Sequence, residues 1–478
     1  MRKIPAVSAD AGFVDVATHP ETRGIELIAD SERHGRPREL FGVWAAPMVS
    51  VLNFTIGASL TVLLGLEIWQ AILVIAASNL LWVFPGIVAI SGPAAGTSGS
   101  VITRAIYGII GNKIYIAFYG WFISGVFLAL NWVASSFMGA ELLAQMGVDK
   151  DLALIVVTIG VAAITVLVAV YGHALILKAY AALTIALLVI FLTVTAFILP
   201  TVDWSFQQPE PLGGIELWSS LTISFAILAS TPLSFSNSAD MARYLPEDTR
   251  PSRIIAATAL GGALPTFFFT SIGALLGSVV SADALEFGIE FALLDMLPIW
   301  LVPVFVIGVI VNTVALNGMT TYTASMAFQS IGIPIRRIPS AIIIGVLGTF
   351  FTIYLVMSTS LLDAVNIMLQ VLILISAPGI TVYCADILLR RNRYDGLDLF
   401  DERPGAKYWY TGGFGVPGLA AGIIGGAAAS FFLTTDFWSG AIAEAMGYID
   451  LSAPVAMIVS GGLYYLFTRR GYTFGDAR

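Results

Sequence analysis

Long apolar stretches follow one another along nearly the whole chain, separated by short polar connections. Clear examples are residues 152–171, 185–199 and 338–357. A bilayer core is roughly 30 Å thick, so a helix of about 20 mostly apolar residues crosses it. The pattern predicts spans at residues 41–64, 68–90, 114–142, 152–172, 175–199, 217–238, 254–280, 297–325, 338–358, 361–389, 414–433 and 452–468. We therefore expect an all-α integral membrane protein with about twelve transmembrane helices.

The positions of the charged residues support the predicted spans and indicate how the protein is oriented in the membrane. Only 11% of the 478 residues are charged, against about a quarter in a soluble domain. If the spans are right, all but one of the 23 Lys and Arg residues lie on the side of the N-terminus, and Lys150 is the exception. The opposite connections are acidic and carry Asp149, Asp151, Asp203, Glu210, Asp283, Glu286, Glu290, Asp436 and Glu444. Because Lys and Arg favour the cytoplasmic side, we expect both termini in the cytoplasm and the bundle in the plasma or inner membrane.

Several classes of function are disfavoured by what the chain lacks. Residues 1–40 contain no apolar core of a signal peptide and are predicted to be a cytoplasmic tail. Cys384 is the only cysteine and the three histidines form no HExxH motif, so neither a disulfide nor a metal site is expected. No GxSxG or GK[ST] motif and no basic stripe for nucleic acid occurs. The sequence predicts neither an enzyme nor a bound cofactor, apart from a coupling ion.

Polar residues and prolines interrupt the first and sixth spans. The first span contains Pro47, Ser50 and Asn53, and the sixth contains Pro232 within a hydroxyl-rich stretch. Interrupted helices at matched positions of two halves indicate an inverted-repeat transporter, in which freed backbone groups bind substrate and ion. A simple kink or packing role is the alternative. The expected organisation is a tail (1–40), a first repeat (41–199), a second repeat (217–390), a cytoplasmic loop (391–413), two further spans (414–468) and a second tail (469–478).

The eighth span contains a candidate substrate-binding residue. Asn317 presents both a donor and an acceptor, which suits the edge of a heterocyclic base. A hydrogen bond to a neighbouring helix is an equally good interpretation of this residue. No carboxylate or lysine falls at the middle of a span, so a neutral substrate is expected, and aromatic residues such as Trp121 and Phe235 offer surfaces on which a planar ring stacks.

Four stretches of the chain have distinctive motifs, namely Gly92–Arg104 with Tyr107-Gly108, the Gly120-Trp121 pair, Ser238–Pro246, and Pro378–Asp386 with Arg390-Arg391 and Tyr394-Asp395. These stretches resemble the purine–cytosine permeases of the nucleobase:cation symporter group. The resemblance extends from about Phe41 to Gly471. It implies twelve helices in a five-plus-five inverted-repeat fold of the LeuT-like type, with two extra C-terminal helices, and uptake of a nucleobase-like ring with Na⁺ or H⁺.

The resemblance also implies roles for particular residues. Trp121 matches the ring-stacking Trp of the family, and Asn317, five residues before Tyr322-Thr323, matches the Asn that binds the base. A second ring-stacking Trp is missing, and Ser234 and Phe235 stand nearest to its position. The implied substrate site is Trp121, Asn317, Phe235, Ser234, Asn53 and Ser50, the implied cation site is Pro47, Ser50, Gly308, Val311 and Asn312, and the implied cytoplasmic gate or packing residues are Arg104, Asp240 and Arg243.

The leading hypothesis is a secondary symporter that imports cytosine, a purine or a related neutral heterocycle. Val311 and Asn312 stand where Na⁺-coupled relatives carry hydroxyl residues, and this loss favours H⁺ over Na⁺. A carrier of the same fold for hydantoin, allantoin, a vitamin or an amino acid is one alternative. A passive channel is an alternative of another class. The expected partners are the substrate, the cation and the lipid bilayer.

Overall fold

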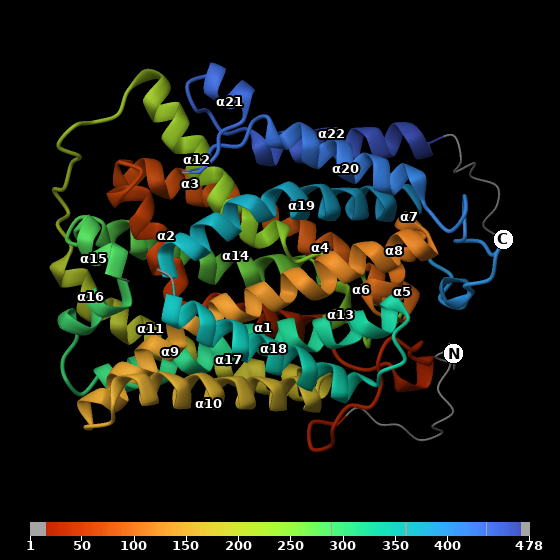
Figure 1. The fold of residues 1–478 in the computed structure, drawn as a ribbon, viewed down its shortest axis with the longest axis horizontal. Coiled ribbons are helices and arrows are strands. Elements are labelled where there is room, and N and C mark those ends of the chain that lie inside the picture. Colours follow the sequence, from red (N-terminus) through yellow and green to blue (C-terminus); the bar gives the residue numbers. More distant parts are fainter. Residues whose placement is uncertain (1–15, 288, 359–360, 436, 470–478) are drawn as a thin grey trace.

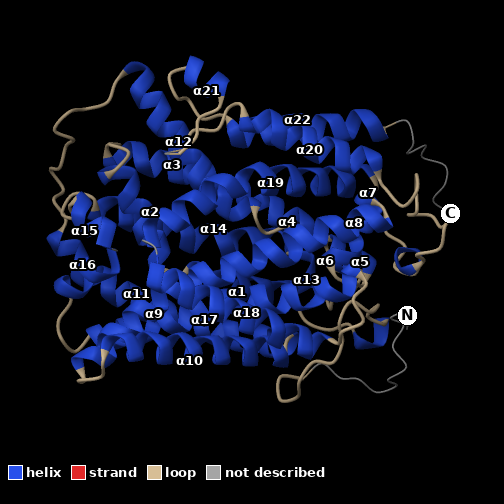
Figure 2. Cartoon of the chain, in the orientation of Figure 1, coloured by secondary structure: helices blue, strands red, loops and turns tan. Residues whose placement is uncertain are grey.

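The computed structural model describes residues 16–287, 289–358, 361–435 and 437–469. Within these residues the chain forms helices joined by loops (Figure 2). Most of the long helices run in the same direction across the molecule (Figure 1). Each of the twelve predicted spans coincides with a helix or with a run of consecutive helices.

The first half of the chain supplies five spans and several short helices. Its elements are η1 (Asp30–Glu32), α1 (Pro37–Met48), α2 (Val51–Val62), α3 (Ile68–Asn79), η2 (Leu80–Trp82), α4 (Val83–Ala89), α5 (Ser91–Ala95), α6 (Gly99–Ile102), α7 (Arg104–Tyr107), α8 (Ile109–Tyr115), η3 (Ile116–Ile123, wound as a π-helix), α9 (Ser124–Gln145), α10 (Lys150–Tyr171), α11 (His173–Ile198) and η4 (Leu199–Thr201).

The second half supplies the remaining spans. Its elements are α12 (Gly214–Leu233), α13 (Ala239–Ala242), α14 (Pro251–Leu276), α15 (Ala282–Phe287), α16 (Ile289–Met296), α17 (Val302–Ile331), α18 (Arg337–Ser358), α19 (Leu361–Leu389), η5 (Asp398–Phe400), α20 (Val416–Ser430), α21 (Ala441–Ala445) and α22 (Ser452–Thr468).

The lengths of the helices fit a multi-pass membrane protein. Among the described residues, nine helical runs are long and apolar enough to cross a bilayer, and α1 with α2 make a tenth across their bend. Helices α20 and α22 are apolar but shorter. These two occupy the places of the eleventh and twelfth predicted spans, and they pack against each other and against α19.

The first span is broken, as the polar pattern predicts. Helix α1 ends one residue after Pro47, and α2 leaves at an angle of 60° to it. The Ser50 hydroxyl accepts a hydrogen bond from Leu52 N at 3.2 Å and so caps the start of α2. The Asn53 amide crosses the break and donates to the Met48 carbonyl at 2.6 Å. Side chains of the span itself therefore satisfy part of the backbone that the break frees.

The sixth span is broken at its C-terminal end. Pro232 lies in the last turn of α12, and the helix ends at Leu233. Residues 234–238 are not helical, and the short α13 follows them. A proline cannot donate a backbone hydrogen bond, and it clashes with the preceding turn. The interruption therefore follows from the residue on which the prediction was based.

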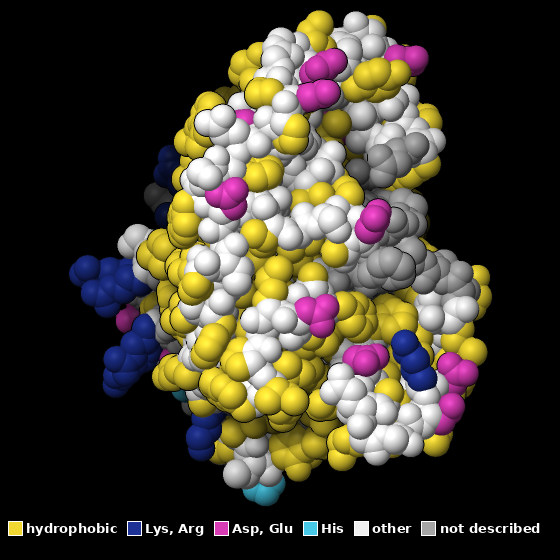
Figure 3. All heavy atoms as spheres, turned by 90° about the vertical axis from the view of Figure 1, so that its left-hand side faces the viewer, with side chains coloured by type: hydrophobic (Ala, Val, Ile, Leu, Met, Phe, Trp, Pro, Cys, Tyr) yellow, Lys and Arg dark blue, Asp and Glu magenta, His cyan; other side chains and the backbone are white. Residues whose placement is uncertain are grey.

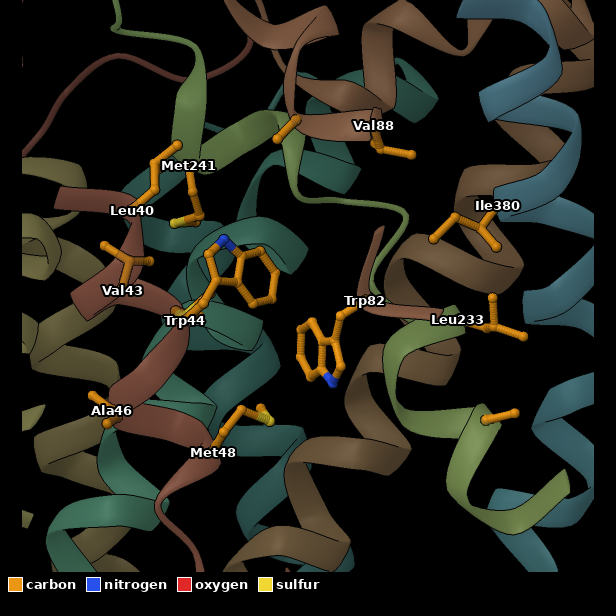
Figure 4. Close-up of a cluster of buried hydrophobic side chains, with 14 of the residues drawn as sticks. Leu40, Val43, Trp44, Ala46, Met48, Trp82, Val88, Leu233, Met241 and Ile380 are labelled. Carbon is orange, nitrogen blue, oxygen red and sulfur yellow. The ribbon is translucent and has the colours of Figure 1, made fainter. Parts of the chain in front are cut away.

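The two broken spans have mostly different neighbours. Helix α1 packs on α11, α14 and α17, and α12 packs on α3 and α19. Helix α9 lies against α10, α17 and α18. An apolar cluster joins α1 to the end of α12, and within it Trp44 of α1 meets Trp82 of η2 edge-on with ring centroids 5.8 Å apart (Figure 4).

The residues before α1 differ from a freely solvated tail. Ile25 and Ile28 are buried against the bundle, and Ile25 N donates to the Gln329 side chain of α17 at 3.1 Å. Ile28 N donates to the Gly96 carbonyl at 2.8 Å. This N-terminal segment (residues 17–36) therefore packs as part of the folded molecule.

Charged side chains differ between the two ends of the bundle. Figure 3 looks onto the end at which α15 and α16 lie, where Asp and Glu side chains are scattered over the surface and most of the Lys and Arg side chains in view project from its border. The described chain begins and ends at the opposite end (Figure 1). This arrangement agrees with the alternation of charge along the sequence.

Candidate functional site

A small, partly enclosed cavity lies where the third, sixth and eighth spans meet. Its volume is about 60 Å³, and its wall includes Tyr119 and Phe127, Ser234 at the break after α12, Asp240, and Thr323 of α17. Pockets that bind small molecules usually measure about 300–1,000 Å³. The cavity is therefore small for a ligand site, and we expect the surrounding elements to open when a substrate binds.

Tyr119 connects the third span to the broken sixth span. Its hydroxyl donates to the Ser234 carbonyl at 2.7 Å, and its ring stacks on Tyr115 with centroids 5.5 Å apart. The Ser234 carbonyl is available because the helix has ended one residue earlier. The bond therefore uses a backbone group that the Pro232 break has freed.

Trp121 and Phe235, the predicted ring-stacking pair, lie in different clusters. Phe235 stacks on Trp82 at 5.5 Å and meets Trp44 edge-on at 4.9 Å. Trp121 packs against Phe328 of α17, with centroids 5.2 Å apart. The structure does not place these two rings face to face, so their role as walls of one substrate site stays a prediction for another state of the protein.

Asn317 is buried, and both the nitrogen and the oxygen of its side-chain amide form hydrogen bonds to the third span. Its Nδ2 donates to the Leu128 carbonyl at 2.9 Å, and its Oδ1 accepts from Asn131 Nδ2 at 3.0 Å. This is the helix–helix arrangement that was the alternative interpretation of the residue. These two bonds use one N–H group and one lone pair of the amide, which has one of each left. The role of Asn317 in binding a base stays a prediction.

The side chain of Asn312 occupies the predicted cation site. Its Nδ2 donates to the carbonyls of Ala46 and Pro47, each at 3.0 Å. These carbonyls are at the C-terminal end of α1, where the helix dipole favours a positive group. The neutral Asn312 amide thus donates to the two carbonyls that would coordinate a cation at this position.

The other residues of the predicted substrate and cation sites have mainly local contacts. Ser50 and Asn53 stabilise the break of the first span, as described above. Gly308 lies against Ile190 and Phe191 of α11 and leaves little room for a larger side chain. Val311 is partly buried in the main apolar cluster. None of these contacts tests their predicted roles.

Arg104 and Arg243, the predicted gate or packing residues, are both buried and paired. Arg104 forms an ion pair with Glu402 at 3.0 Å and donates to the Leu399 carbonyl at 3.0 Å. Burial lowers the pKa of the Arg104 guanidinium, and the Glu402 carboxylate opposes this shift. Arg243 forms an ion pair with Glu21 and donates to the Tyr322 hydroxyl, each at 2.8 Å.

Sequence reasoning missed several residues that organise this region. Asn131 is an amide within an apolar span, and the cost of burying such a group was a usable signal. Glu21 had no such signal, because a carboxylate in a polar segment before the first span is ordinarily solvated. Tyr119 and Asn237 were single polar residues without a distinctive spacing, and only the fold brings them to one cavity with Thr323 of α17.

The fold defines the class of the protein. The structure is similar to Mhp1, a nucleobase-cation-symport-1 family transporter, in a closed conformation with bromovinylhydantoin bound, with a TM-score of 0.70 at 18% identity over 94% of each chain. The similarity to the inward-facing conformation of Mhp1 has a TM-score of 0.66 at 17% identity, over 95% of this chain and 96% of that one. The predicted inverted-repeat transporter fold is confirmed.

The family follows from the sequence. The model of the permeases for cytosine/purines, uracil, thiamine and allantoin matches residues 27–455, and the chain belongs to this family. It is 24% identical over 470 residues to the putative purine-cytosine permease YxlA of Bacillus subtilis, covering 94% of this chain and 96% of that protein. It is 21% identical over 457 residues to the purine-cytosine permease FCY2 of Saccharomyces cerevisiae, covering 89% and 81%. The chain is a membrane transporter, not an enzyme.

Proposed function

We propose that the protein is a symporter that imports a neutral nucleobase, such as cytosine or a purine, together with a proton by alternating access. The permease family supports the substrate class, because its members carry small heterocycles. The lack of charged side chains at the middle of the spans favours a neutral ring over an ionic solute. The small volume of the cavity supports a cycle in which the site opens and closes.

The observation that carries the choice of H⁺ over Na⁺ is the position of Asn312. Sodium bound at the end of α1 would need the Ala46 and Pro47 carbonyls as ligands, and the Asn312 amide donates to both. An N–H group cannot coordinate a cation. Sodium binding there would require the amide to move away or to turn its oxygen toward the ion, and in either case two hydrogen bonds would break.

Uptake into cells that lack nucleobase permeases tests this proposal. We expect labelled cytosine or adenine to accumulate equally well when Na⁺ is replaced by K⁺, and accumulation to collapse with a protonophore. A panel of uracil, allantoin, hydantoin and thiamine covers the alternative substrates. Uptake that equilibrates without accumulating would show a passive channel, and failure of every compound would refute the substrate class.

Asn312→Ser provides the matching ion test on purified protein. The shorter side chain withdraws the amide and places a hydroxyl oxygen beside the Ala46 and Pro47 carbonyls. We expect Na⁺ to raise the unfolding temperature of the Asn312→Ser variant and not that of the unchanged protein, because a ligand stabilises the state that binds it. A sodium-dependent shift in the unchanged protein would contradict proton coupling.

A further inference from the structure

The cavity contains a carboxylate that differs from the other buried acids. Four Asp or Glu side chains are buried among the described residues, namely Glu21, Asp240, Asp386 and Asp450. Three of them have partners on both carboxylate oxygens. Asp240 alone among them has an oxygen, Oδ2, that is buried without a hydrogen-bond partner.

The two oxygens of Asp240 have different surroundings. Oδ1 accepts from the Ser98 hydroxyl and from Gly99 N, each at 2.8 Å. These bonds fix the carboxylate at the edge of the cavity. The residue is completely buried, so bulk water does not solvate Oδ2. An unpartnered buried carboxylate oxygen is costly in free energy unless something binds it.

Two further oxygens at the cavity wall lack a partner. Thr323 Oγ1 and Asn237 Oδ1 are both buried without a hydrogen bond, and both residues line the cavity with Asp240. The Thr323 hydroxyl lies beside the carboxylate and is able to donate to it, which favours the ionised form. Asn237 Oδ1 can only accept a hydrogen bond. A proton on Oδ2 would therefore add to this cavity wall a donor that the deprotonated carboxylate lacks.

We propose that Asp240, a residue of the cavity wall, binds and releases the coupled proton through its unpartnered Oδ2 atom. This inference rests on the proposed proton symport and names the group that performs it. In the loaded state a proton from water forms an O–H bond at Oδ2. On the cytoplasmic side the bond breaks, and the proton returns to water. No oxidant or further reactant is needed.

The charged and titratable groups around Asp240 are compatible with the binding and release of a proton at this residue. The Arg243 guanidinium is the nearby cation, and it is paired with Glu21. Tyr383 of α19 also interacts with Asp240, and its hydroxyl bonds to Ser91. Helices α4 and α5, which pack on α13, carry no titratable residue.

The remaining neighbours complete this set. On α1, Arg38 is exposed and Glu39 accepts from Arg36 N at 2.9 Å. Tyr115 and Tyr119 of the third span line the cavity. Asp240 lies in α13, outside the spanning helix α12. Burial raises the pKa of its carboxyl, while Arg243, the hydrogen bonds from Gly99 and Ser98 and the neighbouring Thr323 hydroxyl oppose the shift.

Proteoliposomes with an imposed pH gradient test the assignment. The unchanged protein is expected to accumulate labelled cytosine when the outside is acidic. Asp240→Asn should still exchange internal for external cytosine, but its inside-to-outside ratio should fall to one. Asp386→Asn is the control, because it alters a buried carboxylate that pairs with Arg390 and lies outside the cavity wall. Proton-driven accumulation by Asp240→Asn, or accumulation by the unchanged protein in a Na⁺ gradient alone, would overturn the proposal.

A second measurement needs no substrate, and it separates this inference from the proposed function. A buried acid whose pKa is raised by folding stabilises the protein while it is protonated, and this stabilisation is lost as the pH rises through the raised pKa. Between about pH 4.5 and about pH 8, the unfolding temperature of the unchanged protein should fall relative to Asp240→Asn, and Asp386→Asn should retain that fall. Superimposable pH profiles for the unchanged protein and Asp240→Asn would refute the site even if cytosine uptake is observed.

Discussion

Side-chain amides connect the third, eighth and first spans of this transporter. Asn131 and Asn317 join the third span to the eighth, and Asn312 joins the eighth to the end of α1. In a membrane interior each such bond is worth about 0.6 kcal/mol on average. Amides at these positions therefore hold helices together at a modest energy, which a substrate or a conformational change is able to overcome.

The Asn131–Asn317 pair provides a test of base recognition at the scale of one residue. Asn317→Ala removes two interhelical bonds and Asn131→Ala removes one of them. The free energy of unfolding should therefore fall by about 1 kcal/mol and about 0.6 kcal/mol, respectively. If Asn317 binds the base, cytosine should raise the unfolding temperature of the unchanged protein and of Asn131→Ala, and not that of Asn317→Ala. Equal ligand-dependent shifts in both variants would assign Asn317 to helix packing alone.

At the scale of elements, the N-terminal segment joins several helices around one buried carboxylate. Glu21 accepts from Arg243 of the α13 region and from the Tyr244 hydroxyl, each at 2.8 Å, and from Tyr322 of α17 at 3.2 Å. Its second oxygen accepts from His173 N, at the start of α11, at 2.8 Å. One side chain from before the first span therefore holds together elements from both halves of the chain.

Removing this carboxylate should destabilise the whole bundle. Glu21→Ala leaves the Arg243 guanidinium buried without its ion-pair partner, and breaking such a pair typically costs about 3–5 kcal/mol. The free energy of unfolding in detergent, measured by denaturant titration, should fall by an amount in this range. Asp30→Ala is the matched control, because the Asp30 side chain is 87% exposed in its pair with Arg33 and such pairs contribute within about 1 kcal/mol. Equal losses in the two variants would contradict a structural role for Glu21.

The elements were more predictable from sequence than the contacts between them. Apolar length located every span, and Pro47 and Pro232 located both breaks, because these signals act through the local backbone. The partners of Asn312 and Asn317 depend on the rotation and depth of helices far apart in the chain. The rotation and depth of a helix are not determined by the sequence pattern of that helix alone. The burial of Glu21 was hidden for the same reason, since its partners come from four distant segments.

At the scale of the whole molecule, the two ends of the bundle differ in charge in the way that orients membrane proteins. With Lys150 as the exception, the basic residues fall on the side of the two chain ends if the predicted spans hold. Lys and Arg in short loops are retained in the cytoplasm. We propose on this basis that the end with α15 and α16 faces outward and that both termini face the cytoplasm.

Labelling of single cysteines tests this orientation with little background, because Cys384 is the only cysteine and is buried. Lys150→Cys and Lys407→Cys are suitable sites, since the two lysine side chains are 66% and 54% exposed and lie on opposite predicted sides. In intact cells a membrane-impermeant maleimide should label Lys150→Cys at once and Lys407→Cys only after permeabilisation. The unchanged protein controls for reaction at Cys384. The reverse order of labelling would invert the topology, and with it the cytoplasmic position assigned to Asp240 and the N-terminal segment.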